Sequence, residues 1–223
     1  WSHDIGGHML GIRSDVMEAR WYELGTFSPI NRLHSTKMSF SGKEPWNFRP
    51  EVEHAMGEAL RLRHQLLPYL YTMNYLAYKE YRPVIAPMYY DYPEKEQAYP
   101  VQDHSFVEGV SNNQYLFGTD MIVAPITSDQ IASLNQGKVK AWIPEGCYHD
   151  FFTGLIYKGE KVMWMFRGIN SIPVLVKAGG IIPMQKELFG KDFLKNPDIS
   201  DDERTQYLHH KSLWRSGWQL YTL

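Results

Sequence analysis

The densest group of chemically active side chains is a carboxylate between two imidazoles, in the run His3-Asp4-Ile5-Gly6-Gly7-His8. The run follows what is predicted to be the end of a buried strand, and its paired glycines favour a turn. Proteins that combine helices with parallel strands place their active sites at the carboxyl ends of those strands. The run is therefore the first candidate site. An equally weighted interpretation is that Asp4 caps the turn and both histidines are ordinary surface groups.

A second candidate is His34, in the run Phe27-Ser28-Pro29-Ile30-Asn31-Arg32-Leu33-His34-Ser35. Arg32 and His34 both offer hydrogen-bond donors from a loop that follows a predicted helix. An isolated histidine more often satisfies nearby backbone carbonyls, so this alternative stays open. Trp46 and Phe48 could line a sugar or aromatic pocket, but we favour packing for both because buried aromatic rings most often fill a core.

Imidazole and carboxylate groups are also common ligands of zinc and iron, which raises the hypothesis of a metal site at His3, Asp4, His8 and His34. The spacing fits poorly, because His3 and His8 need not converge on a short turning segment and no His-Glu-x-x-His pattern is present. Nucleotide-binding loops of the GxGxxG or Walker type do not occur either. We predict neither a metal nor another cofactor.

The elements that would position these residues alternate in type over the first half of the chain. Apolar residues recur at three- and four-residue intervals over residues 15–27 and 51–81, which predicts two amphipathic helices. Pro68 should kink or divide the second helix. Residues 84–90 form a short apolar run of the kind buried in a parallel sheet. This order favours an α/β fold with helices outside a parallel sheet or barrel.

Past residue 110 the pattern becomes that of short strands. Such strands without intervening helices predict a β-sandwich, and we place the domain boundary at about residues 105–120. The stretch 201–223 shows neither helical nor strand periodicity, so no element is predicted there. The predicted strands are residues 121–126, 139–143, 148–152, 162–166 and 172–176.

Composition narrows the class of protein further. The 223 residues include 23 Lys and Arg against 25 Asp and Glu, a net charge of −2, so no basic field would attract nucleic acid or an anionic membrane. No stretch approaches the ~20 apolar residues of a membrane-spanning helix. The single cysteine, Cys147, excludes an internal disulfide and suits a reducing compartment, so we expect a cytoplasmic protein. The start at Trp1 rather than Met indicates a processing point or a piece of a longer protein.

Seven segments, taken in order, resemble glycoside hydrolase family 31, the α-glucosidase and α-xylosidase family. The last two look like the proximal C-terminal β-sandwich of that family. The segments are WSHDIGGH (1–8), FSPINRLHS (27–35), EPW (44–46), LLPYLYT (66–72), QYLFGTDMIVAP (114–125), PEGCYHDFFTG (144–154) and PVLVKAGGIIP (173–183).

The resemblance implies a (β/α)₈ TIM barrel followed by an all-β sandwich domain. On this basis residues 1–110 are the last strands and helices of the barrel, 111–199 the proximal C-terminal β-sandwich, and 200–223 an unassigned tail. Residues 1–4 would then be the seventh barrel strand and residues 84–90 the eighth.

The family consists of retaining glycosidases, which need one carboxyl group as nucleophile and another as acid/base. In the family both lie upstream of the segment that matches Trp1, in motifs that this sequence does not contain. The expectation is therefore the C-terminal part of a longer enzyme, with no catalytic carboxylate of its own.

Asp4 matches the Asp of the family's Asp-Ile-Gly-Gly-Phe motif, and His34 matches the His of its Arg-x-His motif. The resemblance implies that both side chains hold the non-reducing sugar through its hydroxyl groups. His8 stands where many members carry Phe, and it is assigned no role. The expected function is a part of a retaining α-glucosidase that hydrolyses terminal α-linked glucose from oligosaccharides. An α-xylosidase and a non-catalytic carbohydrate-binding or structural module are the alternatives.

Overall fold

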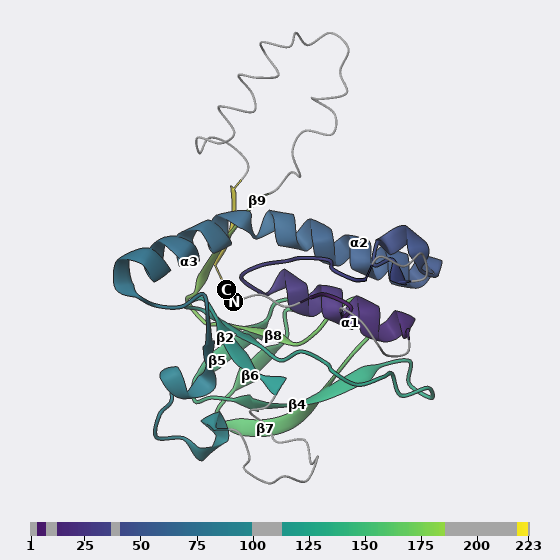
Figure 1. Ribbon diagram of the computed structural model, residues 1–223. Coiled ribbons are helices and arrows are strands. Elements are labelled where there is room, and N and C mark those ends of the chain that lie inside the picture. Colours follow the sequence, from purple (N-terminus) through teal and green to yellow (C-terminus); the bar gives the residue numbers. More distant parts are fainter. Residues whose placement is uncertain (1–3, 8–12, 37–40, 100–112, 186–217, 223) are drawn as a thin grey trace, which may run out of the picture.

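The computed structural model describes residues 4–7, 13–36, 41–99, 113–185 and 218–222, the last of these by its backbone alone. Three helices, α1 (Asp15–Thr26), α2 (Pro50–Gln65) and α3 (Leu67–Glu80), lie on one side of the strands of the main sheet, and β9 (Ile181–Gln185) rises beside α2 and α3 (Figure 1). The two-stranded antiparallel sheet of β4 (Gly137–Ile143) and β7 (Lys161–Arg167) lies on the other side. The described chain is thus a helical layer over β layers.

Helix α1 confirms the prediction for residues 15–27. The Ser14 hydroxyl caps its first turn by accepting a hydrogen bond from the Met17 N–H at 3.3 Å. Asp15 and Glu18 place carboxylates in that turn, where they interact favourably with the helix dipole. Phe27 is the C-cap and is buried, so the helix ends inside the core.

Pro68 divides the helix predicted for residues 51–81 into α2 and α3. Leu66 lies between the two helices and caps both. Proline has no N–H, and its ring clashes with the carbonyl of the preceding turn, so a straight, unbroken helix through it is strongly disfavoured. Leu66 is fully buried and its N–H still donates to the Leu62 carbonyl at 2.9 Å. The junction is therefore a packed bend.

The five strands predicted after residue 110 are all present, and four further strands were missed. The predicted ones are β3 (Met121–Val123), β4, β5 (Cys147–Asp150), β7 and β8 (Val174–Lys177). The missed ones are β2 (Tyr115–Phe117), β6 (Ile156–Lys158), β9 (Ile181–Gln185) and β10 (Trp218–Thr222). β2 and β6 have three residues each, too few to show a period of two. β10, in the stretch without a predicted element, pairs antiparallel with β9.

The expectation that residues 84–90 form a parallel barrel strand is wrong. They hold β1 (Ile85–Pro87) and the 3-10 turn η3 (Met88–Tyr90), and β1 pairs antiparallel with β2. β1 is the edge of a six-stranded sheet in the order β1-β2-β3-β8-β5-β6. Within the described ranges, parallel pairing occurs at the bridge between Ile5 and Leu33. A short apolar run indicates that a strand is buried on both faces, but it does not indicate whether the strand pairs parallel or antiparallel. The sequence therefore could not predict the direction of this strand.

Helices and strands share one large core, and a smaller cluster fills the space between α1 and α2. The small cluster includes Ile5, Tyr22, Val52 and Phe48. Phe48 is 8% exposed, as predicted, but Trp46 is 71% exposed on the 3-10 turn η2 (Pro45–Asn47), so the packing prediction for Trp46 is wrong. Besides η2 and η3, the described residues form the 3-10 turn η4 (Glu96–Ala98). The large core joins α3 and Phe27 to the six-stranded sheet and to the two-stranded sheet of β4 and β7.

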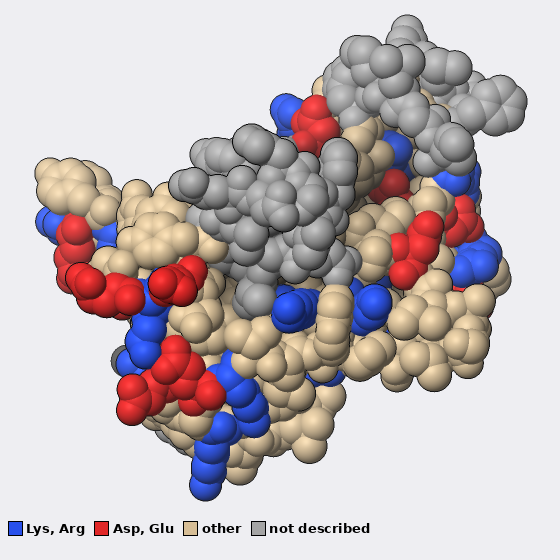
Figure 2. Space-filling view, turned by 90° about the horizontal axis from the view of Figure 1, so that it is seen from below, with Lys and Arg blue, Asp and Glu red and all other residues tan. Residues whose placement is uncertain are grey.

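Acidic and basic side chains alternate over the face seen in Figure 2, without a large area of one sign. This pattern agrees with the small net charge of −2. In the parts of the chain that the structure describes, no helix is both long and apolar enough to span a bilayer.

A buried carboxylate fixes the turn after β5. Asp150 Oδ1 accepts hydrogen bonds from the N–H groups of Phe152 at 3.1 Å and Thr153 at 2.9 Å. Its Oδ2 pairs with the guanidinium of Arg167 on β7. Removing this carboxylate would leave the buried end of the Arg167 guanidinium and two part-buried N–H groups without their partner.

We expect Asp150→Ala to lower the free energy of unfolding by roughly 2–4 kcal/mol, because it breaks a buried, hydrogen-bonded ion pair. Asp91→Ala, which breaks the exposed pair with Arg82, is the matched control and should cost less than about 1 kcal/mol. Urea unfolding followed by tryptophan fluorescence measures both. An equal loss for the two variants would contradict the structural role of Asp150.

Candidate functional site

The two candidate motifs of the sequence meet in the structure. An ion pair joins Asp4 Oδ1 to the guanidinium of Arg32, and the two side chains are 26% and 55% exposed. Beside it, the Ile5 N–H donates to the Arg32 carbonyl at 3.1 Å, and Ile5 pairs with Leu33. The segment after the predicted strand and the loop after α1 therefore form one small platform of adjacent extended chains.

His34 follows the residue that pairs with Ile5. Ile5 is fully buried and Leu33 packs against the same small core cluster. The ion pair places Arg32 beside Asp4, and the alternation of side chains along extended chain predicts the same side for His34, two residues further on. His34 is partly buried. His3 and His8, the imidazoles on either side of Asp4, lie outside the described residues.

A glycine turn directly after Asp4 holds this platform against α1. Gly6 and Gly7 have φ angles of +82° and +77°, a region that side chains disfavour, and the Gly7 N–H donates to the Asp4 carbonyl at 3.1 Å. A Cβ on Gly6 would lie 2.2 Å from a carboxylate oxygen of Glu18. The absence of a side chain thus lets the turn lie directly on the helix.

Lys43, which lies just before η2, links the glycine turn to α1. Its Nζ donates to the Gly6 carbonyl at 2.8 Å and lies 3.7 Å from Glu18 Oε2. Burial raises the pKa of Glu18, and the neighbouring Lys43 and Arg13 charges counteract this rise only in part. The Tyr22 hydroxyl donates to the Lys43 carbonyl at 2.5 Å, and burial raises the pKa of that phenol.

Sequence reasoning missed Glu18 and Lys43, and it treated Arg32 only as a general donor. The pair Gly6-Gly7 was the available signal in the sequence, because paired glycines indicate that another group packs closely against the backbone. The sequence does not identify that group as Glu18, because the contact depends on packing between separate segments. Chemically, the platform presents an oriented carboxylate, a guanidinium and an imidazole, which together suit hydrogen bonding to hydroxyl groups.

A metal site is not formed within the described ranges, where no three His, Cys, Asp or Glu side chains converge. Asp4 has Arg32 as its partner. The prediction of no metal stays a prediction, because His3 and His8 are outside those ranges.

We expect Gly6→Ala to destabilise the protein by roughly 2–4 kcal/mol, because it adds a strained φ and displaces the buried Glu18 carboxylate. Gly154→Ala is the matched control, since Gly154 also has a positive φ of +71° but a Cβ there would have no atom within 4 Å. That variant should lose only about 1 kcal/mol. Thermal and urea unfolding compare the two, and equal losses would show that Glu18 does not constrain the turn.

Among known proteins, alpha-glucosidases and an alpha-xylosidase are similar to this chain. The chain is 26% identical over 218 residues to alpha-glucosidase 2 of Bacillus thermoamyloliquefaciens, covering 98% of this chain and 25% of that protein. It is 28% identical over 189 residues to an alpha-xylosidase of Saccharolobus solfataricus, covering 82% and 23%. The chain thus spans about a quarter of the length of these relatives.

Solved structures agree with these relatives. The glucose complex of a Flavobacterium johnsoniae GH31 dextranase matches with a TM-score of 0.69 and 29% identity, over 82% of this chain and 21% of that one. A GH31 alpha-xylosidase from Xanthomonas citri matches with a TM-score of 0.70 and 28% identity, over 84% and 20%.

Family models divide most of the chain between two domains of the same family. Residues 1–73 match the TIM-barrel domain of glycosyl hydrolases family 31, and residues 81–182 match the C-terminal domain of that family. β1 and the six-stranded sheet fall within the second range. The chain therefore belongs to glycoside hydrolase family 31 and comprises part of its barrel domain and its C-terminal domain.

Proposed function

We propose that this chain is part of a retaining α-glucosidase that releases terminal α-linked glucose from oligosaccharides, and that Asp4 and His34 bind the terminal sugar. The observation that carries the proposal is the ion pair between Asp4 and Arg32, which joins two sequence motifs at one exposed platform. A carboxylate oriented by a guanidinium is a strong acceptor for sugar hydroxyl groups.

The proposed division of labour follows from the chemistry of retention. A retaining glycosidase needs a nucleophile and an acid/base about 5–5.5 Å apart across the scissile bond. In this proposal those carboxyl groups come from outside this chain. Asp4 and His34 hold the sugar by its hydroxyl groups, and such bonds accelerate the reaction to the extent that they strengthen in the transition state.

An α-xylosidase is the second candidate. Relatives of both kinds are about equally similar, since the Saccharolobus alpha-xylosidase is 28% identical and the Bacillus alpha-glucosidase 26%. The two substrates differ by the hydroxymethyl group on the sugar ring. Comparing the kcat/KM of the complete protein for 4-nitrophenyl α-glucoside and for the α-xyloside distinguishes the two candidates. The proposal is overturned if the complete protein hydrolyses neither substrate.

We expect Asp4→Asn and His34→Ala, each in the complete protein, to lower kcat/KM by roughly ten- to a thousandfold. The reason is the loss of a strong hydrogen bond to the sugar, in a site where such bonds contribute to the transition state. The measurement is steady-state hydrolysis of the 4-nitrophenyl glycoside.

Asp91→Asn is the control, because Asp91 is also a partly exposed carboxylate paired with an arginine, Arg82. It should leave kcat/KM unchanged. Thermal unfolding of each variant separates a loss of binding from a loss of folding. Wild-type kinetics for a folded Asp4→Asn variant would refute the assignment of Asp4.

Two carboxyl groups suffice for hydrolysis with retention, so the proposed reaction needs no metal. We expect that dialysis against EDTA will leave kcat and KM unchanged. Activity that disappears with the chelator and returns with zinc or another added divalent metal would contradict this mechanism.

A further inference from the structure

The peptide bond between Gly6 and Gly7 is held at both of its polar ends. Its N–H group, on Gly7, donates to the Asp4 carbonyl at 3.1 Å. Its carbonyl, on Gly6, accepts from the Lys43 Nζ at 2.8 Å. Two glycines in a row place few steric limits on the backbone, so this peptide can rotate once these bonds are lost. The lysine therefore selects one conformation of the turn that follows Asp4.

Lys43 is fixed at both ends of its side chain. Its backbone carbonyl accepts from the Tyr22 hydroxyl at 2.5 Å, and its Nζ lies 3.7 Å from Glu18 Oε2. The lysine side chain is 17% exposed, and a mostly buried ammonium group needs a negative charge nearby, which Glu18 supplies. Tyr22 and Glu18 both belong to α1. Through Lys43, the position of this helix thus determines the position of the turn.

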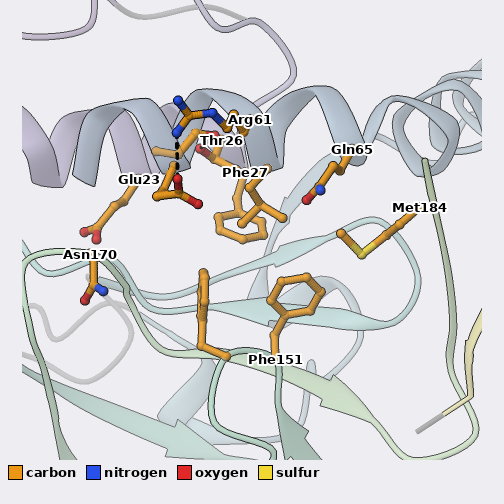
Figure 3. A pocket seen from close by; sticks show the side chains of 12 residues that line it. Glu23, Thr26, Phe27, Arg61, Gln65, Phe151, Asn170 and Met184 are labelled. Atoms are coloured by element: carbon orange, nitrogen blue, oxygen red, sulfur yellow. Dashed lines mark hydrogen bonds and ion pairs between the residues drawn. The ribbon is translucent and has the colours of Figure 1, made fainter. Parts of the chain in front are cut away.

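Helix α1 is a fixed support for this contact, because other residues of the helix join it to the C-terminal domain. Arg20 donates to the backbone carbonyls of Ser171 and Arg167 at 2.7 and 3.0 Å, and Glu23 neutralises its charge. A cavity of about 440 Å³ lies beside these contacts, bordered by Glu23 on α1 and by Phe152 on the loop after β5 (Figure 3). Side chains do not fill this space, so the bonds from Arg20 are what fix α1 here.

The ion pair with Arg32 does not by itself fix the Asp4 carboxylate. The Arg32 side chain is 55% exposed, and an exposed ion pair is a weak constraint on geometry. The backbone of Asp4 is held more firmly, by the Gly7 N–H on its carbonyl and by the pairing of the next residue, Ile5, with the Arg32 carbonyl. The direction of the carboxylate therefore depends on the turn.

We infer that Lys43 is a positioning residue for sugar binding: by fixing the Gly6 carbonyl, with Glu18 as its counter-charge, it sets the orientation in which Asp4 meets the sugar. This inference rests on the proposed function, in which Asp4 binds the terminal sugar. Lys43 does not need to touch the sugar, because its ammonium group binds the turn.

The test compares kcat/KM of variants of the complete protein for the 4-nitrophenyl glycoside. Lys43→Met removes the donor and keeps an unbranched side chain. It should lower kcat/KM by about tenfold, because a small displacement of a substrate-binding group is costly. Lys43→Arg keeps a positive charge and N–H donors, so its kcat/KM should stay within about threefold of the wild-type value.

Lys95→Met is the matched control. Lys95 Nζ donates to Glu160 Oε2 at 2.8 Å, so this variant also breaks an ion pair, but one that does not involve the glycine turn. It should leave kcat/KM unchanged.

A double-mutant cycle distinguishes positioning of Asp4 from a purely structural role. In an Asp4→Ala background, Lys43→Met should lower kcat/KM no further, because the carboxylate that the lysine orients is absent. A loss of the same size in both backgrounds overturns the inference.

Glu18→Gln gives an independent variant that leaves Lys43 in place, which matters if Lys43→Met does not fold. It keeps the shape of the side chain and removes its charge, so it should lower kcat/KM by roughly threefold, less than Lys43→Met does. In the Asp4→Ala background it should again have no effect, and an equal loss in both backgrounds overturns the inference.

Failure of this inference is distinguishable from failure of the proposed function. If the wild-type protein hydrolyses neither 4-nitrophenyl glycoside, both are overturned. If Asp4→Ala lowers kcat/KM while folded Lys43→Met retains the wild-type value, the inference alone is overturned.

Discussion

The buried guanidinium of Arg20 is a fixed polar link between the two domains, beside the apolar core that they share. It extends from α1 to the backbone carbonyls of Ser171 and Arg167, at 2.7 and 3.0 Å, and so joins a barrel helix to the loop between β7 and β8. A buried charge is tolerated only with partners, and Glu23 supplies the opposite charge from the next turn of the helix. The pair gives α1 one orientation over the β layers.

Helix α1 therefore positions two different surfaces. On one side Glu18 and Trp21 lie against the glycine turn, and Gly25 makes room for the side chain of Ile5. On the other side Glu23 and Thr26 border the cavity. The glycine turn beside Asp4 and the cavity therefore both border α1.

The C-terminal domain also relies on side chains that replace backbone pairing. The Gln114 amide donates to the Trp142 carbonyl at 2.6 Å and accepts from the Trp142 N–H at 2.9 Å, as a neighbouring strand would. Asp150 similarly satisfies the N–H groups of the turn that carries Phe152. Each of these side chains is buried, so an apolar substitute would leave backbone groups unsatisfied.

By itself, the sequence determined the elements whose signals are local. The spacing of apolar residues predicted α1, Pro68 predicted the division between α2 and α3, and short β-rich runs predicted five of the strands. The motifs at Asp4 and His34 identified the family and the candidate sugar contacts. These signals lie within a few residues of the features they specify, so a single sequence is enough to recognise them.

Only the tertiary structure decided which distant segments meet. The antiparallel pairing of β1, the pairing of β10 with β9 and the parallel bridge from Ile5 to Leu33 leave no local trace, because apolar character indicates burial but not the partner strand. The same holds for Lys43 under the glycine turn, and for the cavity between Glu23 and Phe152. Both arise where surfaces far apart in the chain pack together, and packing depends on the whole fold.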